Sequence, residues 1–132
     1  MIARVITTVA HGSVAVDLPI RIRSEMNSRD HWRTVRKRAQ EHHHAVHYSL
    51  VNFRGLLKLI TDAHRRIVVT FTRIGPGWFD DDNLAGGFKF CRDAVAKLIG
   101  IDDGSERFDW RYRQERGRVH SARVCIEAGG DA

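Results

Sequence analysis

The segment from Arg66 to Ile99 constrains the fold more than any other part of the chain. It begins with Arg-Ile-Val-Val-Thr-Phe-Thr-Arg at 66–73, a β-branched and aromatic run that is typical of a strand. Gly75-Pro76-Gly77 ends this strand and opens a loop, after which apolar residues at helical spacing predict a helix from about Leu84 or Phe88 to Ile99. Gly100 then favours the end of the helix. A strand followed by a turn and a helix indicates an α/β (α+β) fold.

Helical and β-rich patterns also occur on both sides of this segment. An amphipathic pattern over residues 28–63 predicts helical structure with Ser28 as its N-cap. The pattern permits one helix or two, because the His-rich middle and Gly55 allow a break. Four further stretches are typical of strands: 2–10, 13–18, 108–114 and 119–128, of which the first two are interpreted as strands or a hairpin. The turn at 116–117 suggests that the last two form a hairpin. We expect one domain over residues 1–132, a small mixed β-sheet with helices packed on it.

Charge is distributed unevenly along the chain, whose formal net charge is +6. Residues 21–73 carry 12 Lys and Arg against four acids, whereas six of the 16 acidic residues fall between positions 80 and 103. The overall balance favours nucleic acid or another anionic surface as a partner. Cys91 and Cys125 match neither a disulfide framework nor a zinc spacing, and we expect both in the core. No window approaches the ~18 apolar residues of a membrane span, so we expect a cytoplasmic protein that does not enter membranes.

The acidic residues suit divalent-metal chemistry. Asp80 and Asp82 are two positions apart, so both carboxylates point the same way if the loop is extended. Mg²⁺ prefers carboxylate and water oxygens, and such an ion polarises a phosphate and activates the attacking water. One helix starting at position 83, capped by Asp82, would carry Lys89 and Asp93 on the Asp82 face. The alternative interpretation is a solvated cluster at a helix N-terminus, with Lys89 and Asp93 as an ordinary helix pair.

The run from 80 to 103 resembles the signature of the RusA family of Holliday-junction resolvases. The elements that carry the resemblance are Asp80-Asp81-Asp82-Asn83-Leu84, then Lys89, Asp93 and the pair Asp102-Asp103. The stretch from Leu18-Pro19 to Asn27 also resembles the family's N-terminal Leu-Pro…Ser-x-Asn segment, with Ser24 and Asn27 offset. The chain departs from the family at Lys89, because Gly86-Gly87-Phe88 looks like a three-residue insertion.

The resemblance implies a small homodimeric α/β endonuclease, often encoded by prophages, that binds four-way DNA junctions and makes paired nicks with Mg²⁺ or Mn²⁺. Asp80, Asp82 and Asp103 would be catalytic metal ligands, with Asp102 as the fallback if the register slips. Lys89 would be the catalytic cation. One helix length, on the order of 15–20 Å, separates Asp82 from the acidic pair. Either the chain folds back to bring Asp103 to the site, or a second subunit supplies it.

Basic side chains supply the candidate DNA contacts. Those that we expect to meet junction phosphates are Arg29, Arg33, Arg36 and Lys37 on the 28–63 helix and Arg111 and Arg113 on the 108–114 strand. Such contacts follow phosphate positions more than base sequence. An ordinary solvated face is the alternative interpretation. The apolar stretch 50–60 is a candidate dimer surface.

Aromatic and histidine residues admit two interpretations each. Trp78 and Phe79 precede the aspartates, and we expect them to pack the loop onto the core; the alternative is stacking on an unpaired base at a junction. Trp32 and Trp110 are expected in the core or at an interface. His42-His43-His44 with His47 is interpreted as a solvated, partly cationic patch, with a metal site as the alternative.

Two other functions remain open at the level of sequence. A DNA-binding or regulatory protein would keep the fold without cutting, which the insertion before Lys89 favours. A metal-dependent nuclease for other branched or single-stranded DNA is the second. Retained junction binding without cleavage would indicate the former, and preferential cutting of flaps would indicate the latter.

Overall fold

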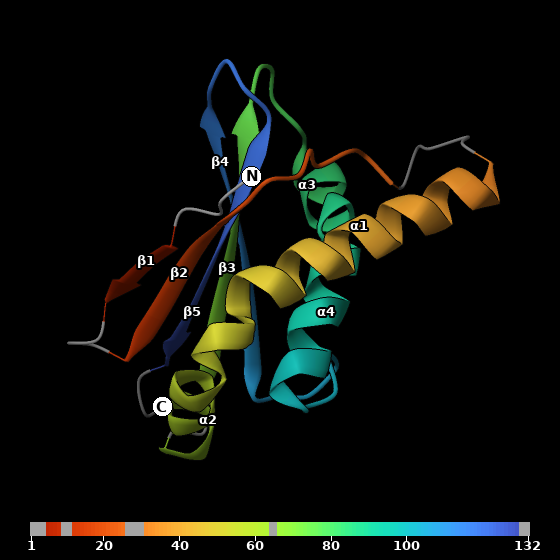
Figure 1. Cartoon of the computed structure of the whole chain (residues 1–132). Helices are drawn as coiled ribbons and strands as arrows, with labels where there is room; N and C mark the ends of the chain where they lie inside the picture. Colours follow the sequence, from red (N-terminus) through yellow and green to blue (C-terminus); the bar gives the residue numbers. More distant parts are fainter. Residues whose placement is uncertain (1–4, 9–11, 26–30, 64–65, 130–132) are drawn as a thin grey trace.

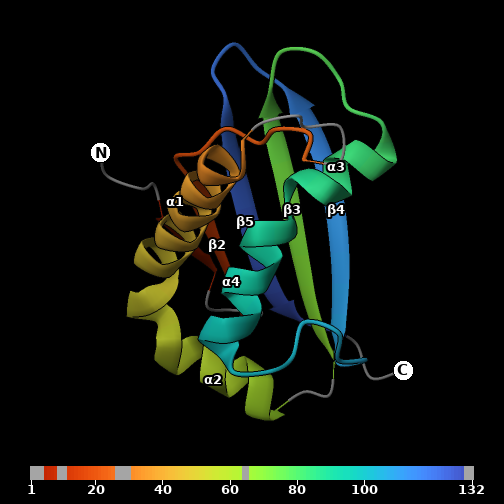
Figure 2. The same cartoon turned by 90° about the vertical axis from the view of Figure 1, so that its right-hand side faces the viewer.

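The computed structural model describes residues 5–8, 12–25, 31–63 and 66–129. The chain forms a five-stranded sheet of order β1-β2-β5-β3-β4 with helices packed on one face (Figures 1 and 2). The strands are β1 (Val5–Thr8), β2 (Ser13–Leu18), β3 (Ile67–Gly75), β4 (Phe108–Arg116) and β5 (Ser121–Ala128). The helices are α1 (Trp32–Leu50), the 3₁₀ turn η2 (Val51–Phe53), α2 (Arg54–Ala63), α3 (Asp81–Gly87) and α4 (Lys89–Ile99). The predicted class, a small mixed β-sheet with helices packed on it, is confirmed.

The strand pairing agrees with the prediction at the N-terminal end and differs at the C-terminal end. β1 and β2 form the expected antiparallel pair, and β2 then pairs antiparallel with β5. The hairpin predicted between the last two strands is wrong, because β3 lies between them, parallel to β4 and antiparallel to β5. The connection from β4 to β5 therefore crosses the end of β3, where the Gly117 N–H donates to the Gly75 carbonyl at 3.1 Å. The final strand begins at Ser121, after an exposed Val119.

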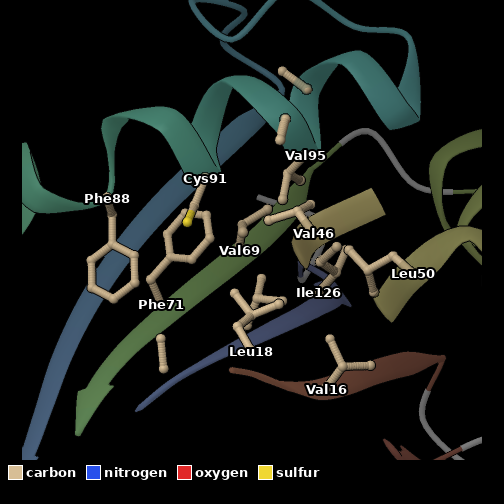
Figure 3. Packing of buried hydrophobic residues seen from close by; sticks show 14 of the residues in the cluster. Val16, Leu18, Val46, Leu50, Val69, Phe71, Phe88, Cys91, Val95 and Ile126 are labelled. Atoms are coloured by element: carbon tan, nitrogen blue, oxygen red, sulfur yellow. The ribbon is translucent and has the colours of Figure 1, made fainter. Parts of the chain in front are cut away.

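The core lies between the sheet and the helices (Figure 3). Val69 and Phe71 of β3 face this layer, and the Phe71 ring stacks on Phe88 with 4.9 Å between centroids. Fully burying side chains of this size contributes roughly 1.5–3 kcal/mol each. Cys91 is a core residue, as predicted. Cys125 is only half-buried, because it alternates along β5 with the core residues and belongs to the other face of the sheet.

Helix α1 differs from the prediction in its start and in its buried face. It begins at Trp32, and the His31 side chain accepts the Arg33 backbone N–H; the predicted cap, Ser28, lies outside the described residues. Trp32, expected in the core or at an interface, is 60 % exposed and so is not in the core, while the interface alternative stays a prediction. The buried face runs through Arg38, His42 and Val46 at i, i+4 spacing. The break between the two helices falls at η2. Within the part of the chain that the structure describes, no helix has the length and apolar character needed to cross a membrane.

The helix predicted from about Leu84 or Phe88 to Ile99 is confirmed with the later start, as α4. A separate short helix, α3, precedes it, and the two helices meet at Phe88. A close approach explains the glycine at the end of α3. A Cβ on Gly87 would lie 2.5 Å from Ile22 Cγ2 and 2.8 Å from the Arg23 carbonyl oxygen. The apparent insertion therefore makes room for residues 19–25, an extended segment that crosses the ends of the strands (Figure 1).

The Gly87→Ala substitution should lower the free energy of unfolding by about 1–3 kcal/mol, because the new methyl group meets a side chain and a backbone carbonyl that are both packed. Gly55→Ala is the matched control, since a Cβ at Gly55 has nothing within 4 Å. Urea denaturation of the three proteins checks this. Equal midpoints for the Gly87→Ala variant and the parent chain would contradict the close packing of residues 19–25 on α3.

Candidate active site

The loop that bears the acidic run is held at the carboxyl ends of the parallel strands β3 and β4. Arg73, 3 % exposed, donates from Nη2 to the Pro76 carbonyl at 2.9 Å, and its guanidinium lies 4.0 Å from the Phe79 ring centroid. Gln114 of β4 makes two bonds to the Phe79 backbone, accepting its N–H at 2.9 Å and donating to its carbonyl at 2.8 Å. The backbone is thus fixed on both sides immediately before Asp80.

Asp80 is the N-cap of α3, the role that we predicted for Asp82. Its Oδ1 accepts the Asn83 backbone N–H at 2.8 Å and its Oδ2 accepts Asn83 Nδ2 at 3.0 Å. The Asn83 side-chain oxygen in turn accepts the Ser24 hydroxyl. The expected extended geometry is wrong, because α3 begins at Asp81. Asp81 and Asp82 therefore occupy the first turn, where they are exposed and negative charge is favourable.

Lys89 and Asp93 lie on α4 and so do not share a helix with Asp82. Lys89 is exposed, with its Nζ 4.9 Å from the Phe90 ring centroid. Asp93 Oδ2 lies 3.0 Å from His43 Nε2 and 3.4 Å from Lys97 Nζ. The ion pairs of Asp93 are therefore with His43 and Lys97, and the predicted helix pair with Lys89 is not among them.

The acidic pair 102–103 occupies the turn after α4. The Asp103 carbonyl accepts hydrogen bonds from Arg92 Nη2 at 3.2 Å and from Trp110 Nε1 at 3.0 Å. The Asp103 carboxylate lies 3.9 Å from Arg92 Nε. The turn is thus fastened to both α4 and β4. The Gly104 N–H donates to Asp102 Oδ1 at 3.1 Å, and this bond, with the Asp103 side chain, lowers the pKa of Asp102.

The structure does not draw the predicted metal ligands together. All of them are described residues, and within the described chain no three His, Cys, Asp or Glu side chains gather as a metal-binding group. Asp80 and Asp82 lie at the start of α3, whereas Asp103 follows the end of α4. The two α3 carboxylates still fit Mg²⁺, because this ion is commonly held by one or two carboxylates with waters and substrate phosphates. The assignment of Asp103, with Asp102 as its fallback, stays a prediction.

The aromatic residues beside the site divide into buried and exposed members. Phe79 packs against the core, as predicted, and so does Trp110, whose ring stacks on Phe108. Trp78 is 60 % exposed, so its predicted packing onto the core is wrong. Its ring lies 5.9 Å from the Arg116 guanidinium. An exposed ring beside the acidic loop leaves base stacking open as its role.

The histidine run is not a uniform solvated patch. His42 is 2 % exposed in the core, with Nδ1 3.8 Å from Cys91 Sγ and a hydrogen bond to the Arg21 backbone. His43 pairs with Asp93 across to α4, and His44 stacks on Tyr48. These histidines face different neighbours and form no metal site among themselves in the described structure.

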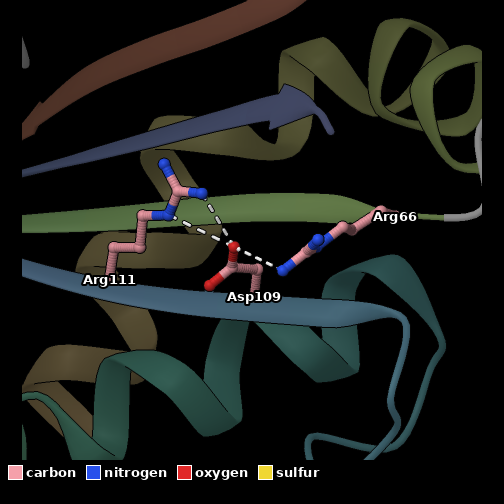
Figure 4. A network of polar contacts seen from close by, with 3 residues as sticks. All are labelled: Arg66, Asp109 and Arg111. Carbon is pink, nitrogen blue, oxygen red and sulfur yellow. Dashed lines mark hydrogen bonds and ion pairs between the residues drawn. The ribbon is translucent and has the colours of Figure 1, made fainter. Parts of the chain in front are cut away.

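The predicted DNA contacts lie on opposite sides of the sheet. Arg33, Arg36 and Lys37 are exposed on α1, and Arg29 lies outside the described residues. Arg111 and Arg113 alternate along β4 with the core-packed Trp110 and Tyr112, so they belong to the face without helices. Arg111 is also engaged, because its Nη2 lies 2.9 Å from Asp109 Oδ2, which Arg66 contacts as well (Figure 4). The two predicted sets therefore lie on different faces of the molecule, and a straight duplex lying on one face would meet only the set on that face.

The packing of the segment 19–25 against α1 and α3 was not predicted from the sequence. Glu25 forms a buried ion pair with Arg38 of α1, and its neighbour Ser24 reaches α3 through Asn83. His42 holds the Arg21 backbone from the same face of α1. The signal was present, since Arg38, His42 and Val46 share one spacing and a charged residue on an apolar face needs a partner.

Comparison with known proteins assigns no family to the chain. No protein-family model matches it, and no curated protein matches it. Its function is therefore inferred from side-chain geometry and from the sequence resemblance of residues 80–103.

The burial of His42 predicts a pH dependence of stability. Burial lowers its pKa, against opposing contributions from Glu25, the Arg21 backbone and Glu41; the charge of Arg38 lowers it further. Between the unfolded pKa of about 6.5 and the lower folded value, only the unfolded chain binds the proton. The contribution of neutral His42 to the free energy of unfolding is thus complete above pH 6.5. It is lost, by up to about 1.4 kcal/mol per pH unit, as the pH falls below that value. Urea unfolding at pH 7.5 and 5.5 should show a smaller loss in His42→Gln; an equal loss would contradict the assignment.

Proposed function

We propose that the chain is a divalent-metal-dependent endonuclease that cuts branched DNA, with the four-way junction as its substrate. The observation that carries the proposal is the fixation of Asp80. Its carboxylate is held by Asn83, which Ser24 anchors, and its loop is clamped by Arg73 and Gln114. Adjacent Asp81 and Asp82 remain exposed. Asp80 is exposed as well, so a carboxylate that is both accessible and held in place lies beside two others, which is a suitable start for a metal site.

The resemblance of residues 80–103 to the RusA family supports the same function. Asp80 and Asp82 would hold Mg²⁺ or Mn²⁺, with Asp103, or Asp102, completing the site. The ion would polarise the phosphate and activate water. Lys89 is exposed at the start of α4 and would place its ammonium near the phosphate charge. Asp103 lies beyond α4, so we include in the proposal a cytoplasmic homodimer in which the partner can complete the site.

The basic surface of α1 supports a phosphate-rich substrate. Arg33, Arg36 and Lys37 are exposed in the first half of this helix, where the described residues include no acid before Glu41. Lys and Arg side chains in such a row neutralise backbone phosphates and release counterions. We propose that this face contacts the arms of the junction.

A second candidate function is junction binding without cleavage. The break at Phe88 favours it, because this break places Lys89 on a different helix from Asp82. Asp93 is also engaged by His43 and Lys97. A junction-cleavage assay distinguishes the two functions.

Asp82→Asn should abolish cutting of a labelled four-way junction in Mg²⁺ while junction binding persists or improves. The substitution replaces a carboxylate metal ligand with a neutral amide, and so removes one negative charge near the phosphate. We expect a loss above about 100-fold, since even partners of metal ligands are worth about 10–100-fold. Asp62→Asn is the matched control, because Asp62 is an exposed acid on α2 paired with Lys58. Comparable cutting by the Asp82→Asn variant would remove Asp82 from the metal site, and junction binding without cutting by the parent chain would favour the second candidate.

The Arg33→Ala/Arg36→Ala variant should weaken junction binding and flatten its salt dependence. Each lost phosphate contact reduces the slope of log affinity against log salt by about 0.9. Fluorescence anisotropy over a salt series measures this slope. Arg111→Ala/Arg113→Ala, on the other face of the sheet, is the comparison. If the salt slope of junction affinity fell only in the Arg111→Ala/Arg113→Ala variant, the DNA would have to bind on the face of the sheet without helices.

A further inference from the structure

Three arginines, Arg21, Arg23 and Arg73, gather around His120 beside the acidic loop, and we refer to these four side chains as the cationic cluster. Arg21 and Arg23 are exposed on the extended segment, on either side of the buried Ile22. The alternation turns both guanidinium groups outward. The charges that act on His120 come from Arg21, Arg73 and Arg23, with no carboxylate among them.

Arg73 and His120 are brought together by the absence of a side chain at Gly75. A Cβ on Gly75 would lie 2.8 Å from His120 Nδ1 and 3.4 Å from Arg73 Nη2. The Arg73 guanidinium is buried beneath this point, and its Nε has no hydrogen-bond partner among the described residues. Burial and the charge of Arg21 both lower the pKa of Arg73.

The cluster continues into a groove on the α1 side of the segment. Arg21 and Arg23 line this groove, of about 630 Å³, together with Lys37 of α1. Among the described residues that line it, Glu41 is the one acid. A groove with this balance of charge attracts an anion along its length.

Contacts from α1 and α3 hold the segment 19–25 in place on both sides of Arg23. Arg21 is held by His42, and Glu25 by Arg38, both from α1. Ser24, next to Arg23, is bonded to Asn83, which follows Asp82. An anion bound by Arg23 would therefore lie close to the acidic loop along a fixed stretch of chain.

We infer that the cationic cluster binds a backbone phosphate of the nucleic acid substrate, with Arg21 and Arg23 making the contacts and Arg73 adding charge from beneath. This inference rests on the proposed function, because a polynucleotide places a second phosphate beside the one that is held. The bound phosphate offsets the mutual repulsion of the arginine charges. The next phosphate along the DNA strand then lies beside Asp80 and Asp82. The site positions the substrate and takes no part in the chemistry.

The test compares Arg21→Ala/Arg23→Ala with the parent chain and with Arg54→Ala/Lys58→Ala, which removes the same charge from the exposed face of α2. Two measurements are made without metal: binding of a fluorescein-labelled four-way junction over a salt series, and the NMR titration of His120 with and without inorganic phosphate. We expect the Arg21→Ala/Arg23→Ala variant to lose roughly tenfold in affinity and one to two units of salt slope, at about 0.9 per phosphate contact, while the α2 variant changes little.

Phosphate should raise the pKa of His120 in the parent chain, because a bound anion stabilises the imidazolium. The Arg21→Ala/Arg23→Ala variant should lose this response. Unchanged salt slopes, or a His120 pKa that ignores phosphate in the parent chain, would overturn the inference. Neither readout requires cleavage, so a parent chain that binds through Arg21 and Arg23 but never cuts would reject the nuclease and keep the phosphate site.

Discussion

The buried ion pair between Glu25 and Arg38 is the interaction on which the arrangement of this domain depends. The two side chains are 2 % and 9 % exposed, so removing either would leave an uncompensated charge at a cost of about 3–5 kcal/mol. The pair holds an extended segment against α1, and one residue earlier Ser24 fastens that segment to α3. The ion pair and the Ser24–Asn83 bond together place α1 and the acidic loop relative to each other.

The parts of this fold that could be predicted are those whose signal is local. The strand at 67–75 and the stop at Gly100 follow from residue type and backbone preference, and both are present. The false hairpin at 116–117 arose because pairing between strands depends on the whole chain, and β3 occupies the position that a local rule gives to β4. The separate short helix α3 before Phe88 was not predicted, for a related reason. It depends on the contact of Gly87 with a segment more than 60 residues earlier in the sequence.

The candidate site shows the same division. The acidic residues and their chemistry were evident from composition and spacing, whereas the identity of the capping residue was not, because Asp80 and Asp82 are equally good caps by type. The backbone decides between them, since Arg73 and Gln114 hold the chain extended up to Asp80. The burial of Arg73 also had no local signal. Arginine side chains are mostly exposed, and here the Arg73 guanidinium packs against the Phe79 ring.

The strand order has a consequence for how the protein is made. β2 finds its long-range partner in β5, the last strand that the structure describes, and β3 also needs β5 to complete its second edge. During synthesis the first hairpin therefore waits, unpaired along one side, until more than 100 further residues have been added. A domain built this way folds late and all at once, and its rate is set by closure between distant parts of the chain. Until then its edge strands are open to other chains, which makes this stage the one most exposed to aggregation.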